Sequence, residues 1–187
     1  DKHPTWLLHF CATLSKRLSR VEQQYSKGRD AFITLAEEFY SSRTLEEQQF
    51  LRRASLLTTI DPKIIDFLLG SKKAQEFLAA LEKSQLPLIR RLDDGGFELH
   101  GFFRDFLVEK LLAVEGKPTK QLLHAQLATL YDALKSWDQA IHHCIEAQDW
   151  AGATQLLTAH KEELLNGSSS FLKNALERVP ADHFSSD

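Results

Sequence analysis

Apolar residues recur every three or four positions through most of the chain, which predicts a mainly helical protein. The first such stripe places four apolar side chains on one helix face, at Trp6, Phe10, Leu14 and Leu18. A second stripe predicts a helix over residues 30–40, with Asp30 as its N-cap. Residues 1–43 are therefore predicted to form a helical subdomain.

Two further helices are bracketed by capping residues. Thr44 is followed three positions later by Glu47, which is the spacing of a capping box at the start of a helix. Asp61 precedes Pro62 as an N-cap precedes the first helical position, and Gly70 stands where the helix should end. These residues predict one helix from residue 45 and a shorter one from residue 62.

The hydrophobic period then changes from helix to strand and back. "SKKAQEFLAALEKSQ" is predicted as a third helix capped by Ser71, and "LPLIRRL" and "FELHG" read as two strands joined by the turn "DDGG". "FFRDFLVEKLLAVEG" is helical again and is predicted to stop at Gly116 and Pro118. Three helices followed by a hairpin are the order of a winged helix, which we assign to residues 44–116.

Residues 117–187 carry only helical patterns. Four helices are predicted over "KQLLHAQLATLYDALK", "SWDQAIHHCIEAQ", "DWAGATQLLTAHKEELLN" and "SSSFLKNALERVP". Their short connections favour antiparallel neighbours, and the alanines allow paired helices to approach closely. The region resembles tetratricopeptide-type repeats. The predicted fold is mainly α: a winged helix flanked by an N-terminal helical subdomain and C-terminal TPR-like helical repeats.

Composition narrows the class of protein. The net charge of −3 argues against a surface that attracts nucleic acid as a whole, and no apolar run is long enough for a membrane helix. Two widely spaced cysteines, Cys11 and Cys144, favour a reduced, cytoplasmic setting. The chain contains no methionine, so we expect it to be a piece of a longer protein.

The motifs of common enzymes are absent from the sequence. There is no phosphate-binding P-loop, since "GSKKA" at Gly70 lacks the first glycine and follows a helix instead of a strand. Neither a nucleophile elbow nor a zinc-protease motif occurs. In "HHC", residues 142–144, consecutive helical side chains point in different directions and no second cluster has zinc-like spacing. We predict no catalytic residues and no metal site.

Two alternatives to a regulatory role in signalling remain open. The first is a DNA-binding winged-helix regulator with a helical dimerisation or ligand-binding domain. The predicted third helix and wing do carry basic residues, but acidic ones are interleaved at Glu76, Glu82, Asp93 and Asp94. The second is a plain protein-binding scaffold, for which Trp137 and Trp150 are candidate contacts, although both positions also suit rings buried against the preceding helix.

Three segments together carry a family resemblance: "GRDAFITLAEEFYSSRTLEEQQFLRRASLL", "LHGFFRDFL" and "HAQLATLYDALKSWDQAIHHCIEAQDWAGATQLL". The chain resembles, over nearly its whole length, the middle of the MalT-type regulators. These are the large LuxR-family ATP-dependent transcription activators of the STAND class of P-loop ATPases. The resemblance implies an upstream nucleotide-binding domain, repeats that receive an inducer or a protein partner, and a separate DNA-binding effector. This chain would be the regulatory, non-catalytic part between them.

The resemblance also implies two nucleotide-binding residues. His100, at the end of the wing, occupies the position of a histidine that contacts the β-phosphate of ADP in this class. A protonated imidazole can donate charge-assisted hydrogen bonds to a phosphate. Pro4 occupies the place of a proline beside the adenine, although Lys2 stands where the family has a glycine. ADP or ATP is expected in the full-length parent and not on this fragment alone. The bland alternative for His100 is packing between Phe97 and Phe102.

Overall fold

The computed structural model describes residues 32–83, 88–93, 95–166 and 169–183. The predicted first helix, the Asp30 cap and Pro4 lie outside these residues. Most of the described chain is helical, with one small antiparallel sheet, which confirms the predicted fold class. The boundaries between the three predicted segments stay predictions.

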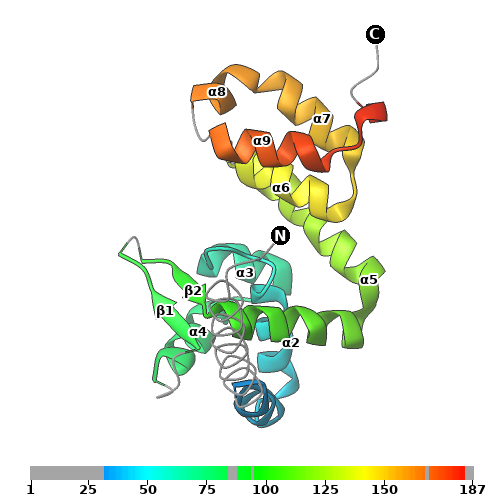
Figure 1. Ribbon diagram of the computed structural model, residues 1–187. Coiled ribbons are helices and arrows are strands. Elements are labelled where there is room, and N and C mark those ends of the chain that lie inside the picture. The colour runs from blue at the N-terminus through cyan, green and yellow to red at the C-terminus, as the bar shows by residue number, and fades with distance from the viewer. Residues whose placement is uncertain (1–31, 84–87, 94, 167–168, 184–187) are drawn as a thin grey trace, which may run out of the picture.

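The first group of helices packs around the small sheet (Figure 1). Residues 32–41 are helical and are followed by α2 (Leu45–Ala54), α3 (Pro62–Leu69) and α4 (Ala74–Lys83). The capping box at α2 is present in full, because the Thr44 side chain accepts from the Glu47 N–H and the Glu47 carboxylate accepts from the Thr44 N–H. The Asp61 carboxylate accepts from the Lys63 N–H at the start of α3. These predictions are confirmed.

The predicted Ser71 cap is wrong. Gly70 ends α3 with a positive φ of 64°, and the Ser71 N–H then donates back to the Asp66 carbonyl at 3.2 Å. Ser71 therefore belongs to the closing turn of α3, as in a Schellman motif. The following helix begins only at Ala74, whose N–H donates to the Asp66 carboxylate at 2.9 Å.

The wing is a short antiparallel hairpin. β1 (Ile89–Arg91) pairs with β2 (Phe97–Leu99), so that Arg90 lies opposite Glu98. Gly95 in the connecting turn has a φ of 86°, a conformation that favours glycine. Ile60, between α2 and α3, adds an isolated bridge to Phe97 that the sequence did not suggest, because one extended residue between two helices carries no strand period.

A long kinked helix, α5 (Gly101–Ala133), leads away from the wing. The break lies at Gly116, whose φ of 81° and ψ of 166° interrupt the helix as predicted. The chain becomes helical again at once, and Pro118 stands in the first turn after the break, where a missing N–H costs little. The two halves of α5 therefore join the winged helix directly to the helices that follow.

The remaining helices form a second group at the far end of α5 (Figure 1). They are α6 (Trp137–Ala147), α7 (Trp150–Ala159), α8 (Lys161–Asn166) and α9 (Ser169–Arg178), followed by a 3₁₀ turn at Ala181–His183. The sequence predicted one helix where α7 and α8 lie. His160 divides them because its backbone leaves the helical region, with φ −115° and ψ 23°.

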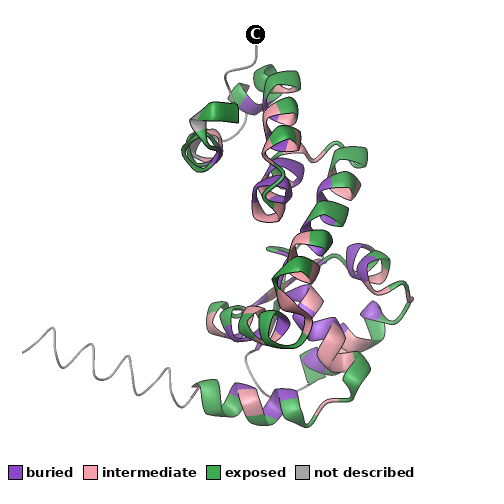
Figure 2. Cartoon of the chain, turned by 90° about the vertical axis from the view of Figure 1, so that its right-hand side faces the viewer, coloured by how far each residue is buried: buried purple, intermediate pink, exposed green. Residues whose placement is uncertain are grey.

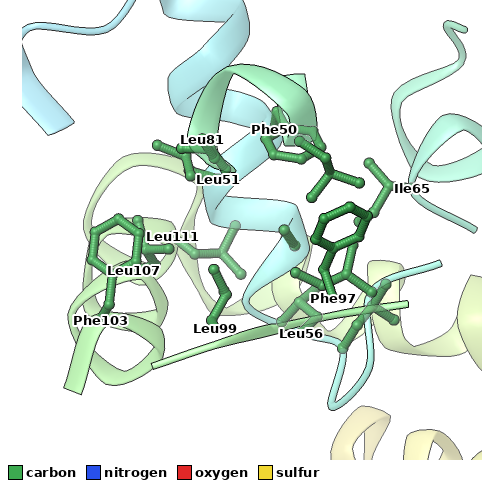
Figure 3. Close-up of a cluster of buried hydrophobic side chains, with 14 of the residues drawn as sticks. Phe50, Leu51, Leu56, Ile65, Leu81, Phe97, Leu99, Phe103, Leu107 and Leu111 are labelled. Carbon is green, nitrogen blue, oxygen red and sulfur yellow. The ribbon is translucent and has the colours of Figure 1, made fainter. Parts of the chain in front are cut away.

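The larger hydrophobic core belongs to the winged helix. Figure 3 shows side chains from α2, α3, α4, β2 and α5 meeting in one cluster, among them Phe50, Phe97 and Phe103. Leu123 and Leu127, from α5 beyond the kink, belong to the same cluster. The second half of α5 is thus packed on the winged helix as well as on α6.

A smaller core lies among α6, α7 and α9, and Figure 2 shows the buried positions on the inner faces of these helices. It contains several small residues, including Ala153 and Ala175, as the predicted close helix approach requires. Cys144 is buried there, and burial raises the pKa of its thiol to about 11. Within the described residues, no helix is long and apolar enough to cross a membrane.

Candidate functional site

The backbone fixes His100 at the junction between the wing and α5. Its N–H donates to the Leu88 carbonyl at 2.9 Å, which extends the hairpin by one bond. Its carbonyl accepts from the Arg104 N–H at 2.9 Å, which is the first bond of the helix. The residue is thus the N-cap of α5, but its side chain makes no capping hydrogen bond. The imidazole is held at the amino end of a helix, where the helix dipole favours negative charge.

Two phenylalanines hold the imidazole ring, while the residue as a whole stays exposed. Phe32 stacks on it with centroids 5.1 Å apart, and Phe102 lies 5.7 Å away. The alternative that packed His100 between Phe97 and Phe102 is wrong for Phe97. This side chain is 1% exposed and belongs to the core, because successive strand side chains point to opposite faces and Phe97 lies three residues before His100. Phe32 lies 68 residues earlier in the chain, and no local pattern could have identified it.

An open hollow of about 510 Å³ adjoins His100. It is lined by residues of both wing strands and by the start of α5: Ile89, Arg90, Glu98, Leu99, His100 and Gly101. Arg90 and Glu98 form an ion pair across the strands, and the Arg90 hydrogen bond keeps the pKa of the Glu98 carboxyl below its usual range. The hollow therefore combines a helix amino end and an exposed imidazole, which suit an anionic group, with an arginine whose charge is paired with Glu98. Pro4 cannot be related to it, since it lies outside the described residues.

Three basic residues beside the third helix and on the wing are paired with carboxylates. Lys73 lies 2.7 Å from Glu46, and Arg91 lies 3.7 Å from Glu82. Together with the Arg90–Glu98 pair, these contacts offset positive charge on the third helix and the wing. Such internal pairing lowers the attraction of this face for a nucleic-acid backbone.

The other sequence candidates have packing roles. Trp137 and Trp150 both pack against the smaller core, and the ring of Trp137 stacks on His160 with centroids 4.0 Å apart. His143 and Cys144 of the "HHC" segment are buried. In the part of the chain that the structure describes, no three His, Cys, Asp or Glu side chains are placed to hold a metal ion.

A buried histidine pair was missed by the sequence analysis. The Nδ1 atoms of His124 on α5 and His143 on α6 lie 2.9 Å apart, and Tyr131 stacks on His143. Burial lowers the pKa of His124 to about 4 and that of His143 to about 3. Both rings are therefore neutral at pH 7, with one Nδ1–H donating to the other Nδ1. Nineteen residues separate the two histidines, so only the packing of the helices reveals the pair.

The fold and the site geometry define a winged helix followed by packed helical hairpins, with an exposed histidine where the wing meets the next helix. Comparison with known proteins places this arrangement: residues 36–119 match the family model of the MalT winged helix domain. The chain therefore carries a winged helix of the MalT family, and the resemblance inferred from the sequence is confirmed.

Curated relatives extend the similarity beyond that domain. The HTH-type transcriptional regulator MalT of Serratia proteamaculans is 31% identical over 180 residues, which are 89% of this chain and 19% of that protein. MalT of Yersinia enterocolitica is 30% identical over 149 residues, covering 78% of this chain and 16% of that protein. MalT of Klebsiella pneumoniae is 28% identical over 180 residues. The chain spans about a fifth of the length of the curated relatives it matches.

Proposed function

We propose that this chain is the regulatory, non-catalytic segment of a STAND-type, ATP-dependent transcriptional regulator of the cytoplasm. It would couple the nucleotide state of an upstream domain to repeats that sense an inducer or a protein partner. DNA would be bound by a separate effector domain. The similarity to transcriptional regulators named MalT over most of the chain supports this proposal.

The placement of His100 is the observation that carries the nucleotide part of the proposal. An exposed imidazole at the amino end of α5, beside a hollow of about 510 Å³, is accessible to a phosphate presented by another domain. Phe32 and Phe102 restrict the ring orientation, which reduces the entropy lost on binding. A bound phosphate would favour the protonated imidazole and hold the winged helix against the nucleotide domain.

The helix α5 supplies a physical route from that contact to the repeats. It begins beside His100, bends at Gly116, and contributes Leu123 and Leu127 to the winged-helix core before packing along α6. Gain or loss of the phosphate contact would shift the winged helix and α5 together. Such a rigid-body change is one of the established modes of nucleotide-dependent switching.

The alternative of a DNA-binding winged helix is less well supported. It requires a basic third helix and wing, whereas Lys73, Arg90 and Arg91 are each paired with a carboxylate of the same chain. Protein–DNA affinity depends strongly on cations available to phosphates. We therefore assign DNA recognition to another part of the regulator.

The test compares two substitutions at His100 in the regulator that carries this chain with its nucleotide-binding domain. His100→Ala removes the imidazole, and His100→Phe keeps a ring between Phe32 and Phe102 while removing the N–H donors. Each protein is purified, denatured, and analysed by chromatography for released ADP. We expect ADP in the wild type and a marked loss in both variants.

The other outcomes separate the alternatives. ADP retained by His100→Phe but lost by His100→Ala would reduce His100 to a packing residue. ADP retained by both variants would exclude His100 from the nucleotide site while leaving the family role in place. Absence of nucleotide from the wild type would contradict the STAND-type proposal.

A further inference from the structure

A second, smaller pocket lies where the winged helix meets the first helical hairpin. Its volume is about 230 Å³. One wall comes from the segment after α2, including Thr58, and from Arg104 on the first half of α5. The other lining residues include Lys120 and His124 beyond the kink and His142 and Glu146 on α6. This pocket shares no lining residue with the hollow beside His100.

Cations outnumber carboxylates around this junction pocket. Arg104, before the kink of α5, and Lys120, beyond it, both line the pocket, and Glu146 is the acidic residue among its lining side chains. The charge of Glu146 is already engaged by Arg178 at 2.7 Å and by Lys120 at 3.6 Å. Burial opposes ionisation of Glu146, but Arg178 and Lys120 hold the pKa of this carboxyl below its usual range. The net positive charge around the junction pocket therefore favours an anionic ligand.

Two buried polar atoms on the lining residues lack a partner. Arg104 uses one terminal nitrogen to donate to the Thr58 carbonyl at 3.0 Å, whereas its Nε–H is buried and has no acceptor among the described residues. The Nε2 atom of His124 is likewise buried and unsatisfied within the described part of the chain, and this residue is only 3% exposed. Buried polar groups without a hydrogen bond are costly, so a ligand oxygen that accepted from them would be stabilised here.

The histidine pair can adapt to such a ligand. When the His143 Nδ1–H donates to His124 Nδ1, the neutral His124 carries its proton on Nε2 and can donate it. An oxygen acceptor in the pocket would select this tautomer. Arg104 Nε–H, His124 Nε2–H and the Lys120 ammonium would then supply three donors from both sides of the junction.

We propose that the junction pocket binds a phosphate-sized oxyanion that bridges the winged helix and the helical hairpin. The guest would be inorganic phosphate or the terminal phosphate of a small metabolite, since a pocket of about 230 Å³ accommodates a compact group. Binding would tie Arg104, before the Gly116 kink, to Lys120 and His124 beyond it. This inference does not depend on the nucleotide proposal, because it concerns different residues.

The experiment titrates the full 187-residue chain with inorganic phosphate at constant ionic strength near neutral pH. The imidazole ¹⁵N resonances of His124 and His142 report binding at the pocket, and chloride replaces phosphate in a parallel titration. We expect a saturable shift with phosphate and none with chloride. Arg104→Gln and Lys120→Gln should each weaken the affinity about tenfold, the effect of losing one charge-assisted hydrogen bond.

Arg91→Gln is the matched control, because Arg91 is a surface arginine that lines neither pocket. Arg91→Gln should keep the wild-type affinity for phosphate. Loss of binding in Arg90→Gln, which alters the other hollow, but not in Arg104→Gln would place the anion beside His100 and overturn the proposal. Equal weakening in Arg104→Gln, Lys120→Gln and Arg91→Gln would indicate non-specific charge, and no saturable shift would exclude the site. Unfolding midpoints without phosphate confirm that each variant is folded.

Discussion

The two cores of the molecule are built differently. The winged-helix core is rich in large aromatic and aliphatic side chains, such as Phe50, Phe97 and Phe103. The core among α6, α7 and α9 is smaller, contains alanines, and adjoins the buried pair of His124 and His143. The first region is therefore held mainly by apolar burial, whereas the second also depends on polar groups that must remain neutral.

The stability of the two regions should therefore depend differently on pH. Apolar packing changes little with pH, but a neutral buried histidine is destabilising wherever the unfolded chain would bind a proton. The second half of α5 belongs to both regions, since Leu123 and Leu127 lie in the larger core while His124 faces His143. The second half of α5 is thus packed against both regions.

The largest expected effect is a cavity in the winged-helix core. Phe103 is fully buried and packs edge-on against Phe39, with centroids 5.9 Å apart. Phe103→Ala should lower the free energy of unfolding by about 3–5 kcal/mol, the usual cost of removing a buried phenylalanine. Urea denaturation of the variant and the wild type measures the difference.

Leu157→Ala tests the same change in the smaller core. Leu157 is 6% exposed and belongs to this core, in which three of the nine buried residues that the structure describes are alanines. We expect a loss of about 2–3 kcal/mol, near the lower end of leucine truncations, because Leu157 keeps part of its surface exposed and belongs to the smaller of the two cores. A larger loss for Leu157→Ala than for Phe103→Ala would contradict the ranking of the two cores.

Acidification should destabilise the second region. The folded pKa values of about 4 for His124 and about 3 for His143 lie below the ordinary value of 6.5. The unfolded chain therefore binds more protons below pH 6.5, and the stability that these neutral rings contribute is lost as the pH falls toward the folded values. Lowering the pH from about 7.5 to about 5.5 should reduce the free energy of unfolding by about 2–3 kcal/mol.

The double substitution His124→Leu with His143→Leu is the control for this pH effect. It should flatten the dependence between these two pH values, apart from the contribution of His142, whose pKa is lowered mainly by burial. The slope is the readout, so a change in overall stability does not affect the comparison. An equally steep slope in the double variant would assign the pH dependence to other groups.

The ionic contact before the kink should have an intermediate effect. The Glu115 carboxylate accepts from Arg52 Nε at 2.7 Å and lies 3.7 Å from Arg53, which ties the end of the first half of α5 to α2. Glu115→Gln should cost about 2 kcal/mol, because Arg52 is largely buried and loses its counter-charge. Thermal unfolding followed by circular dichroism measures the loss.

An exposed pair in the second region provides the control. Lys173 and Glu177 lie 3.9 Å apart on α9, with both side chains largely exposed. Glu177→Gln should change stability by at most about 0.5 kcal/mol, as is usual for surface pairs. Similar losses for Glu115→Gln and Glu177→Gln would show that burial does not strengthen the contact at the kink.

Local signals predicted much of the fold. Thr44, Asp61 and Gly70 cap or end helices through contacts with residues close in sequence, so their roles could be predicted from the sequence. The turn around Gly95 and the break at Gly116 could also be predicted, because glycine favours such positions. Both glycines have positive φ in the structure. The prediction of Ser71 as a helix cap was wrong because the same residue can also belong to the turn that ends α3. In the structure it belongs to that turn.

Contacts between segments that are distant in sequence could not be predicted. His100 was selected through a family resemblance, and its place beside a hollow became clear only in the structure. Phe32 beside His100 and the pairing of His124 with His143 depend on how helices pack, which no local pattern encodes. The candidate residue was thus predictable, whereas its surroundings and the junction pocket were not.

The last comparison concerns the starts of α3 and α6, where we expect losses of stability of about 1 kcal/mol or less. The Asp61 carboxylate accepts the Lys63 N–H at 2.7 Å, so Asp61→Ala should cost about 1 kcal/mol. Asp61→Asn keeps an acceptor oxygen and should recover most of that loss. Ser136, at the start of α6, makes no side-chain capping bond, so Ser136→Ala should change stability by at most about 0.3 kcal/mol. Equal losses at Asp61 and Ser136, measured by urea denaturation, would mean that α6 is capped in solution as α3 is.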